Sequence, residues 1–378
     1  MKQNYIKILK RLISLNSVLT SSNQEITDYI SSLFKLKHCY RVTTQSIKSS
    51  FGLLYNLIIK LPGSSSEKPL VFAGHSDTVP PNSQWKKDPF NARKTSNKLY
   101  GLGSSDMKGA LAIMIDAMLT APEKPKQDIY LIITADEEGM GLGIRNLPKK
   151  LKLKNADIII GESTEGRIRL GQKAVLSYKL NVISHSQHAA YVPLEQNQKI
   201  NPIQQLQKLL SGLTQWAKDN NRQHQTYGGI TFNPGLVYSG TNANSLPSNL
   251  EAEFEFRFPP LLDFKNLDKL DKSIRTEISK ILNSKQYKLE KTFYGGFSET
   301  KKSSSLVKKL QSVAKNTTGK KLGFFNGLGW TEASVYEQFG DVVILGPGTI
   351  SAQHAPDEYV ELKNLKLISL IYKNLIKV

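Results

Sequence analysis

Cysteine is almost missing from this chain of 378 residues, because Cys39 is the only one. An intrachain disulfide is therefore excluded, and so is a structural zinc site built from several thiolates. Cys39 has no recognisable motif around it. Any metal that the protein binds has to be held by histidine, aspartate and glutamate.

Long apolar runs are missing as well. No stretch approaches the ~18 apolar residues of a membrane span, and the longest candidate, residues 110–119, carries Asp116. Residues 1–17 are basic but lack the uninterrupted apolar core of a signal peptide. They predict an amphipathic helix whose inward side carries Ile6, Leu9, Ile13 and Leu15. We expect a soluble cytoplasmic protein without membrane contact.

Acidic residues are few relative to basic ones. The 51 lysines and arginines against 32 aspartates and glutamates give a formal net charge of +19, which raises the question of nucleic-acid binding. However, the lysines are scattered in ones and twos, with no basic motif interleaved with aromatic residues. This pattern favours a solvated surface, and no nucleic-acid partner is expected. The charge would help to attract anionic substrates.

What the chain does contain is enough apolar material for two domains. Its hydrophobic fraction of 39% and charged fraction of 22% are typical of a globular protein. Short apolar runs that do not alternate predict strands covered on both faces, at 53–60, 69–74, 128–135, 156–161 and 341–346. Helical stretches lie between them, notably at 107–120, so the pattern predicts an α/β fold.

The segment 174–290 has a different character. Its order of elements, β-α-β-β-α-β, suggests a small α+β domain that packs separately. Residues 250–258 alternate cleanly, which predicts a half-exposed sheet. The simplest organisation is an α/β domain formed by residues 1–173 and 291–378, with residues 174–290 inserted in it.

Histidine and acidic residues follow the predicted strands, at the points where these strands end. In an open α/β sheet, ligands bind beyond the carboxyl ends of the strands. Each residue alone has a structural explanation: Asp106, for example, is placed to cap the helix that follows it. Jointly, so many acids at one edge would repel one another without a cation. The cluster comprises His75, Asp106, Glu137, Glu138, Glu162 and His354, and the three carboxylates and two imidazoles available from it as ligands predict a pair of divalent ions.

Six motifs, in order along essentially the whole chain, resemble the M20 metallopeptidase family, in particular its group of acetylornithine deacetylases and succinyl-diaminopimelate desuccinylases. The motifs are GHSDTVP at 74–80, WKKDPF at 85–90, KLYGLGSSDMKG at 98–109, TADEE at 134–138, GEST at 161–164 and AQHAPDEYV at 352–360. The resemblance implies a mixed-sheet catalytic domain with two metal ions, and an inserted lid domain that also mediates homodimerisation.

The same resemblance implies a role for each matching residue. Asp106 would bridge two ions, with zinc expected first and cobalt or manganese as substitutes. His75 and Glu162 would complete one metal site, and Glu138 and His354 the other. The other implied roles fall to Glu137, the general base and later proton donor, and to Asp77, whose carboxylate would orient the His75 imidazole.

Residues of the inserted segment are implied to meet the substrate. His188 resembles the lid histidine that reaches across a dimer, although Gln187 stands where the family has glycine and His185 lies close by as an alternative. Asn244 resembles a substrate-facing asparagine. Arg257 is either a cross-strand partner of Glu253 or Glu255 or, as the resemblance suggests, a clamp on a substrate carboxylate.

The substrate is predicted to be a small N-acyl amino acid. The segment GLGWTEA at 327–333 resembles acetylornithine deacetylases, which favours N-acetylornithine or acetylcitrulline. Thr331 and the Gly346–Gly348 turn are expected to contact its amino-acid end. The segment HAAYVPLEQN at 188–197 resembles the desuccinylases instead, so succinyl-diaminopimelate comes second, and dipeptidase or aminoacylase activity third. A catalytically silent binding protein is the alternative from another class, although Glu137 and all five ligands are present.

Overall fold

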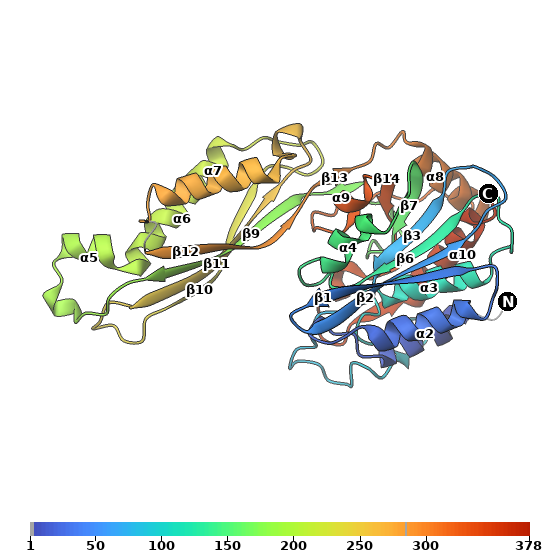
Figure 1. The fold of residues 1–378 in the computed structure, drawn as a ribbon, viewed down its shortest axis with the longest axis horizontal. Coiled ribbons are helices and arrows are strands. Elements are labelled where there is room, and N and C mark those ends of the chain that lie inside the picture. The colour runs from blue at the N-terminus through green and yellow to red at the C-terminus, as the bar shows by residue number, and fades with distance from the viewer. Residues whose placement is uncertain (1–3, 284–285) are drawn as a thin grey trace. The chain divides into compact units, whose positions relative to one another are not determined.

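The computed structural model describes residues 4–283 and 286–378, and the chain forms two compact units (Figure 1). The first unit contains Met1–Gly171, Glu299–Gly327 and Thr331–Val378, and the second contains Gln172–Ser298 and Leu328–Trp330. The second unit extends past residue 290, where the sequence placed its end. It does so because strand β12 (Tyr287–Gly295) stays paired with its neighbour as far as Gly295.

A mixed six-stranded sheet is the centre of the first unit, and it confirms the predicted α/β class. Its order is β1-β2-β6-β3-β7-β14. The strands β6, β3, β7 and β14 run parallel, whereas β1 and β2 are antiparallel to their neighbours. The bounds are β1 Arg41–Ser49, β2 Gly52–Leu61, β3 Leu70–His75, β6 Ile129–Thr134, β7 Ala156–Ile160 and β14 Gly340–Ile344.

Both faces of this sheet are covered, as the lack of alternation predicted. Every residue of β3 and β7 is buried. In β2, Leu57 and Ile59 belong to the main apolar core, whereas Asn56 points to the opposite face and donates a hydrogen bond to the carbonyl of Gly143 at 2.9 Å. Gly143 belongs to the short helix α4 (Leu142–Asn146), which covers that second face.

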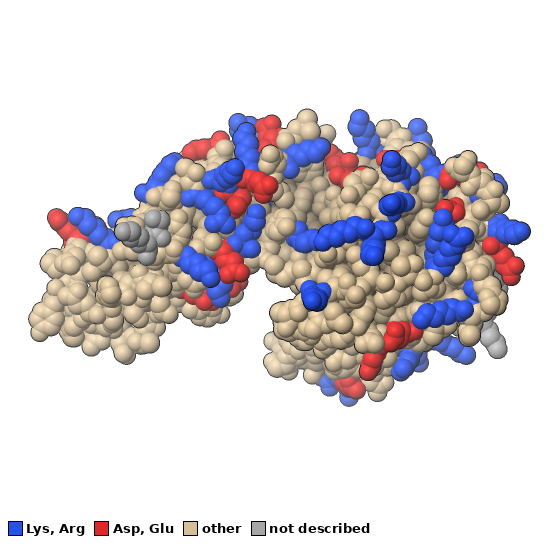
Figure 2. All heavy atoms as spheres, viewed as in Figure 1, with Lys and Arg blue, Asp and Glu red and all other residues tan. Residues whose placement is uncertain are grey.

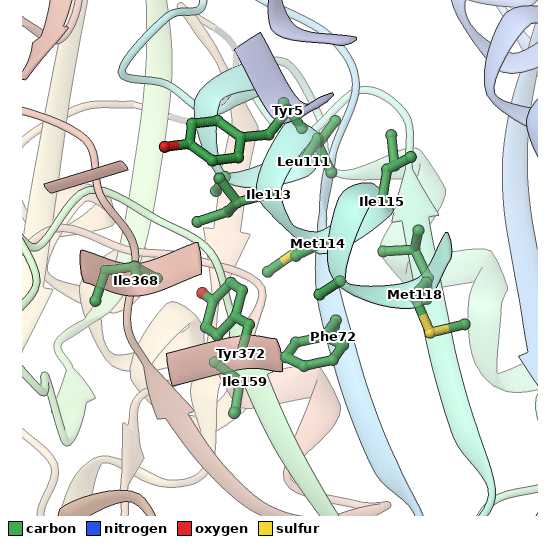
Figure 3. Packing of buried hydrophobic residues seen from close by; sticks show 14 of the residues in the cluster. Tyr5, Phe72, Leu111, Ile113, Met114, Ile115, Met118, Ile159, Ile368 and Tyr372 are labelled. Atoms are coloured by element: carbon green, nitrogen blue, oxygen red, sulfur yellow. The ribbon is translucent and has the colours of Figure 1, made fainter. Parts of the chain in front are cut away.

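Helix α3 (Lys108–Leu119) is buried on all sides, because it packs between the sheet and other helices. Figure 3 shows the side chain of Met114 of α3 pointing toward Tyr372, with Phe72 of β3 and Ile159 of β7 in the same buried cluster. The rings of Tyr372 and Phe72 are 4.8 Å apart. The remaining helices of this unit are α1 Asn4–Ser14, α2 Gln24–Lys35, α8 Ser305–Thr318, α9 Ala333–Tyr336 and α10 Leu362–Leu375.

A second, three-stranded sheet in the first unit ties distant parts of the chain together. Its order is β15-β5-β4, and Tyr359 of β15 pairs with Tyr100 of β5. This pairing brings the segment after His354 to the loop that precedes α3. The bounds are β4 Arg93–Lys94, β5 Lys98–Tyr100 and β15 Tyr359–Glu361. Two of the places where the chain passes from one unit to the other lie in β8 Gly171–Gln172 and β13 Ser298–Glu299.

The second unit is an antiparallel four-stranded sheet in the order β10-β11-β9-β12, with two long helices over one face (Figure 1). The alternation predicted for residues 250–258 is present: Phe254, Phe256 and Phe258 are buried beneath the helices. The elements are β9 Ala174–Ile183, α5 Leu194–Ile200, α6 Pro202–Asp219, β10 Thr231–Ser239, β11 Asn249–Phe258, α7 Leu267–Ser279 and β12.

Among the described residues, no helix is both long and apolar enough to cross a membrane. The basic side chains are spread over the visible face of the molecule and are interspersed with acidic ones, as Figure 2 shows. This distribution agrees with the scattered lysines of the sequence, and the expectation of no nucleic-acid partner stays a prediction.

Candidate metal centre

Three parallel strands end at the candidate site. His75 is the last residue of β3, Glu137 and Glu138 follow β6, and Glu162 follows β7. Because β3 pairs in parallel with both β6 and β7, the carboxyl ends of all three lie at one edge of the sheet. The pairing places His75 opposite Thr134, the last residue of β6.

Asp106 lies between two imidazoles. Its Oδ1 is 3.3 Å from Nε2 of His75, and its Oδ2 is 3.4 Å from Nε2 of His354. It does not cap helix α3, because the cap position belongs to Met107 and makes no side-chain cap bond. One carboxylate that meets two imidazoles through separate oxygens has the arrangement required of a ligand shared by two ions.

Each imidazole has a second carboxylate partner. Oε1 of Glu162 lies 3.2 Å from Nε2 of His75, and Oε2 of Glu138 lies 3.2 Å from Nε2 of His354. Glu137 is set slightly further back, with its Oε2 3.9 Å from Nε2 of His75. The five predicted ligands therefore converge as two imidazole–carboxylate pairs around one shared carboxylate.

The donor atoms fit divalent cations. Nε2 of His75 and Oδ1 of Asp106 are buried and face each other, yet they make no hydrogen bond of acceptable geometry. Leaving buried polar atoms without partners is costly, and a cation between them would remove the cost. Nitrogen and carboxylate oxygen donors suit zinc and also cobalt or manganese. Within the described part of the chain, a ligand role is also open to Glu137, which has an oxygen within 4.8 Å of donors from His75 and Glu162.

The acids and imidazoles of the cluster have strongly shifted pKa values. Hydrogen bonds that the imidazole donates to the carboxylates of Asp106 and Glu138 raise the pKa of His354 to about 10. Burial raises the pKa of Glu138 to about 7, and the nearby Asp106 charge adds to this. Burial alone would lower the pKa of His75, but Glu162 and Asp106 outweigh it and raise that pKa well above its usual value.

These shifts predict how pH affects the metal-free protein. Burial raises the pKa of Glu138 and Glu358 to about 7 and that of Glu332 to about 8, from the ordinary value of 4.5. Between about pH 4.5 and 7 the folded chain thus binds more protons than the unfolded chain, so stability must fall as pH rises. We expect Tm, measured by scanning calorimetry in chelator, to decrease from pH 5 to pH 7.

Zinc is the control for this prediction. Because ligands must lose protons to bind metal, zinc stabilises more as pH rises. At a concentration about 1,000-fold above Kd, it should raise Tm at pH 7 by roughly 10 °C. A metal-free Tm that increases over this pH range would contradict the assignment of buried acids with raised pKa values.

Asp77 contacts both His75 and Glu138, through atoms that the sequence did not predict. Nδ1 of His75 lies 3.0 Å from the backbone carbonyl of Asp77, but 3.7 Å from its carboxylate Oδ1. The other carboxylate oxygen accepts a hydrogen bond from the backbone N–H of Glu138 at 3.0 Å. In this geometry the carbonyl orients the imidazole, and the carboxylate fixes the position of Glu138.

Two further residues reach the site without having been singled out in the sequence. Nε2 of Gln353 donates a hydrogen bond to Oδ2 of Asp106 at 2.7 Å. Glu332 is 1% exposed, and its charge raises the pKa of Glu137 in addition to the larger effect of burial. Two features of the sequence could have identified them: Gln353 is next to His354, and Glu332 lies in the TEA motif.

The glycine turn at 346–348 packs against the segment that carries Glu162. A Cβ atom on Gly346 would lie 2.0 Å from the carbonyl oxygen of Gly161, and one on Gly348 would lie 2.0 Å from Oγ of Ser163. Close backbone approach therefore explains both glycines. Thr331 is buried, and its hydroxyl oxygen accepts a hydrogen bond from the N–H of Ala333 at 3.2 Å. Substrate contact by the turn and by Thr331 stays a prediction.

The second unit brings two predicted substrate residues together. The backbone N–H of Ala189, next to His188, donates to the carbonyl of Asn244 at 2.8 Å. Both His188 and Asn244 are exposed, and Nδ1 of His188 accepts a hydrogen bond from the N–H of Ala190 at 3.2 Å. They thus lie on adjoining loops of one unit, and contact with substrate stays a prediction.

Arg257 forms an ion pair in the second unit. Its Nε and NH2 groups donate to the two carboxylate oxygens of Glu255 at 2.8 and 3.1 Å. This corresponds to pairing with one of the two acidic partners considered from the sequence, two residues away on the same strand. A clamp on a substrate carboxylate would require Arg257 to exchange this partner.

Comparison with known proteins finds a matching family model and several proteins of similar sequence. Residues 71–378 match the family model described as peptidase family M20/M25/M40. The chain is 28% identical over 386 residues to the acetylornithine deacetylase of Buchnera aphidicola subsp. Schizaphis graminum, covering 99% of this chain and 97% of that protein. It is 27% identical to the acetylornithine deacetylase of Pectobacterium carotovorum, with 97% and 96% covered.

Solved structures share the fold. An M20 family metallo-carboxypeptidase from Sulfolobus solfataricus superimposes with a TM-score of 0.79 at 18% identity, covering 100% of this chain and 99% of the other. A dinuclear metal-binding M20 peptidase from Bacillus subtilis gives a TM-score of 0.65 at 14% identity, with 99% and 96% covered. At these identities the likeness concerns the fold alone.

Proposed function

The chain belongs to peptidase family M20/M25/M40 and is a metal-dependent hydrolase, and from this premise we propose that it removes the acetyl group of N-acetylornithine. Two observations support the proposal. The cluster around Asp106 has the donors for two ions in one buried place. In addition, curated relatives named acetylornithine deacetylase match nearly the whole chain, at 28% and 27% identity in the two cases above.

We propose zinc as the resident metal, because imidazole and carboxylate donors suit it. Bound divalent ions would polarise the substrate carbonyl and lower the pKa of a water molecule towards neutrality. His75, Glu162, Asp106, Glu138 and His354 would hold them. Dialysis against a chelator should abolish activity, and zinc or cobalt should restore it; full activity in metal-free protein would exclude this part of the proposal.

The proton transfers are assigned to Glu137. Its carboxylate is next to a ligand in sequence, but it lies further from Nε2 of His75 than the Glu162 carboxylate does, at 3.9 against 3.2 Å. Burial raises its pKa well above the ordinary value, as do the charges of Glu162, Glu138 and Glu332. A carboxyl group with a raised pKa accepts a proton from water readily, and can then donate it to the leaving amine nitrogen.

Residues of the second unit are proposed to bind the rest of the substrate. His188 and Asn244 lie on adjoining loops, and their polar groups would bind the acyl carbonyl. Arg257 would bind the substrate carboxylate in place of Glu255. These assignments depend on the resemblance to the family, and alanine substitutions that raise KM without removing bound metal would support them.

A substrate panel tests the proposed specificity. It compares kcat/KM for N-acetylornithine, N-acetylcitrulline, N-succinyl-diaminopimelate and simple N-acyl amino acids, with zinc-loaded enzyme. We expect kcat/KM for N-acetylornithine to exceed that for each other substrate by at least about tenfold, a difference that a few polar contacts can provide. A lead for the succinyl compound would instead support the desuccinylase alternative, which the segment 188–197 favours.

We also propose a homodimer formed through the second unit. Strand β10 is at the edge of its sheet, so among the residues that the structure describes one of its sides has no strand partner. Leu236, Val237 and Tyr238 on this strand are 45, 49 and 62% exposed. We expect Val237→Lys to convert a dimer to a monomer in light scattering, whereas Leu36→Lys, an exposed site in the first unit, should not. A monomeric wild-type protein would contradict the proposal.

A further inference from the structure

The carboxylate of Glu358 accepts hydrogen bonds from the loop that carries Asp106. Its Oε2 accepts a hydrogen bond from the backbone N–H of Gly103 at 2.7 Å. Its Oε1 accepts from the N–H groups of Ser105 at 2.7 Å and Asp106 at 2.9 Å. Three backbone donors converge on one side chain, and the last of them belongs to the residue that lies between the two imidazoles.

Other hydrogen bonds join the Asp106 loop to the segment that contains His354 and Glu358. The hydroxyl of Ser105 donates to the carbonyl of Tyr359 at 2.7 Å and accepts from the N–H of Thr349 at 2.8 Å. The N–H of Gly101 donates to the backbone carbonyl of Glu358 at 2.9 Å. The segment around His354 is therefore fastened to the Asp106 loop on both sides of the histidine.

Burial makes the Glu358 contacts important. Glu358 is 2% exposed, and a carboxylate at such a depth is costly unless it is hydrogen-bonded and near a positive charge. The buried Lys108 acts electrostatically on Glu358, and its Nζ donates to the carbonyl of Leu15 at 3.0 Å. Because burial lowers the pKa of Lys108 to about 7, the hydrogen bonds to Glu358 remain necessary. Neither Lys108 nor Glu358 faces solvent, so the interaction belongs to the interior of the first unit.

We propose that Glu358 is a positioning residue that sets the separation of the metal ligands Asp106 and His354 before metal binds. It is only four residues from His354, and it holds Asp106 through the backbone. This inference rests on the proposed metal-binding function. It assigns the three N–H contacts a purpose beyond stability: they fix the loop so that the Asp106 carboxylate can face both imidazoles.

The expected effect on zinc affinity can be judged from residues that orient metal ligands in other proteins. Outer contacts that orient metal ligands typically contribute about 10–100-fold to metal affinity. Glu358→Gln keeps the size of the side chain, but its amide nitrogen cannot accept a hydrogen bond. If the remaining oxygen serves Ser105 and Asp106, the N–H of Gly103 loses its partner. The loop should then be held less precisely.

The test measures zinc affinity by competition with a chromogenic chelator, on the full chain, together with Tm in the absence of metal. Glu358→Gln is compared with wild-type protein and with Asp116→Asn. Asp116 is a matched control because it is also a buried carboxylate, paired with Lys373 at 2.7 Å, but lies eight residues along α3 from Lys108. Both variants should lower the metal-free Tm.

We expect Glu358→Gln to weaken zinc binding by about 10–100-fold and Asp116→Asn to leave it unchanged. If both variants bind zinc like wild-type protein, Glu358 contributes only stability and the inference is wrong. If Glu358→Gln does not fold, Glu358→Asp takes its place, since its side chain is one methylene shorter and cannot reach all three N–H groups at once; unchanged affinity in that variant is equally contrary. Failure of wild-type protein to bind zinc would instead contradict the proposed function.

Discussion

Glu137→Ala is expected to lower kcat by about 10²–10⁴-fold while the protein keeps its metal. The reason is the position of the carboxylate, which lies beside the donor cluster but 3.9 Å from the nearest imidazole nitrogen, Nε2 of His75. The group can exchange protons with water and with the leaving amine without being needed to hold an ion. Steady-state kinetics with N-acetylornithine and metal analysis of the same sample measure both quantities.

Two comparisons make the Glu137 result interpretable. Glu138→Ala, one residue further, removes the carboxylate partner of His354 and should lose metal together with activity. Glu123→Ala changes an exposed acid and should alter neither. If Glu137→Ala lost metal as Glu138→Ala does, Glu137 would be a ligand, an arrangement that its distance to His75 and Glu162 leaves geometrically open.

Asp106→Ala has the second large expected effect, loss of both ions and a decrease in kcat/KM of more than about 10⁴-fold. A variant of any other ligand removes a donor from one imidazole–carboxylate pair. Asp106 meets both imidazoles, with Oδ1 near His75 and Oδ2 near His354. Without it, both pairs lose the carboxylate that they share. Zinc content after gel filtration and kcat/KM at saturating zinc are the measurements.

The control for Asp106→Ala is Asp116→Asn, because loss of any buried carboxylate affects stability. Asp116 pairs with Lys373 inside the same unit, and removing one partner of a buried ion pair can cost about 3–5 kcal/mol. We expect Asp116→Asn to bind two ions. Retention of two ions by Asp106→Ala would show that the carboxylate is not shared between them.

Much of the fold was predictable because burial leaves a direct pattern in the sequence. The strands β3 and β7 are covered on both faces, and their apolar runs do not alternate. In β11 the alternation of Phe254 and Phe256 with Glu253 and Glu255 reports one covered face. The end of the second unit was less predictable, because pairing of β12 with β9 depends on partners far away in the chain.

The candidate site was predictable where function places a residue at the end of a strand. His75, Glu138 and Glu162 follow apolar runs directly, so their convergence follows from the sheet. Glu358 and Gln353 were not predicted as contacts of the Asp106 loop. Their partners are set by a hydrogen-bonded loop and by the β15–β5 pairing, neither of which has a periodic signal in the sequence.

At Asp77 the backbone makes the contact with His75 that the resemblance assigned to the side chain. The resemblance assigned its carboxylate to the imidazole of His75, but the nearer atom is the backbone carbonyl, at 3.0 against 3.7 Å. A sequence motif specifies which side chain is present, whereas a carbonyl is present at every residue. Only coordinates can therefore distinguish the two contacts.

The fastening of the Asp106 loop by Glu358 has a consequence for the order in which the protein matures. During translation Asp106, Glu138 and Glu162 leave the ribosome well before His354 and Glu358 do. Until then the acids have one imidazole, His75, and the loop lacks the three bonds that hold it. If these residues hold the metal as proposed, a nascent chain would acquire its full complement only after residue 358 has emerged and folded back, and metal loading would be a late event in biosynthesis.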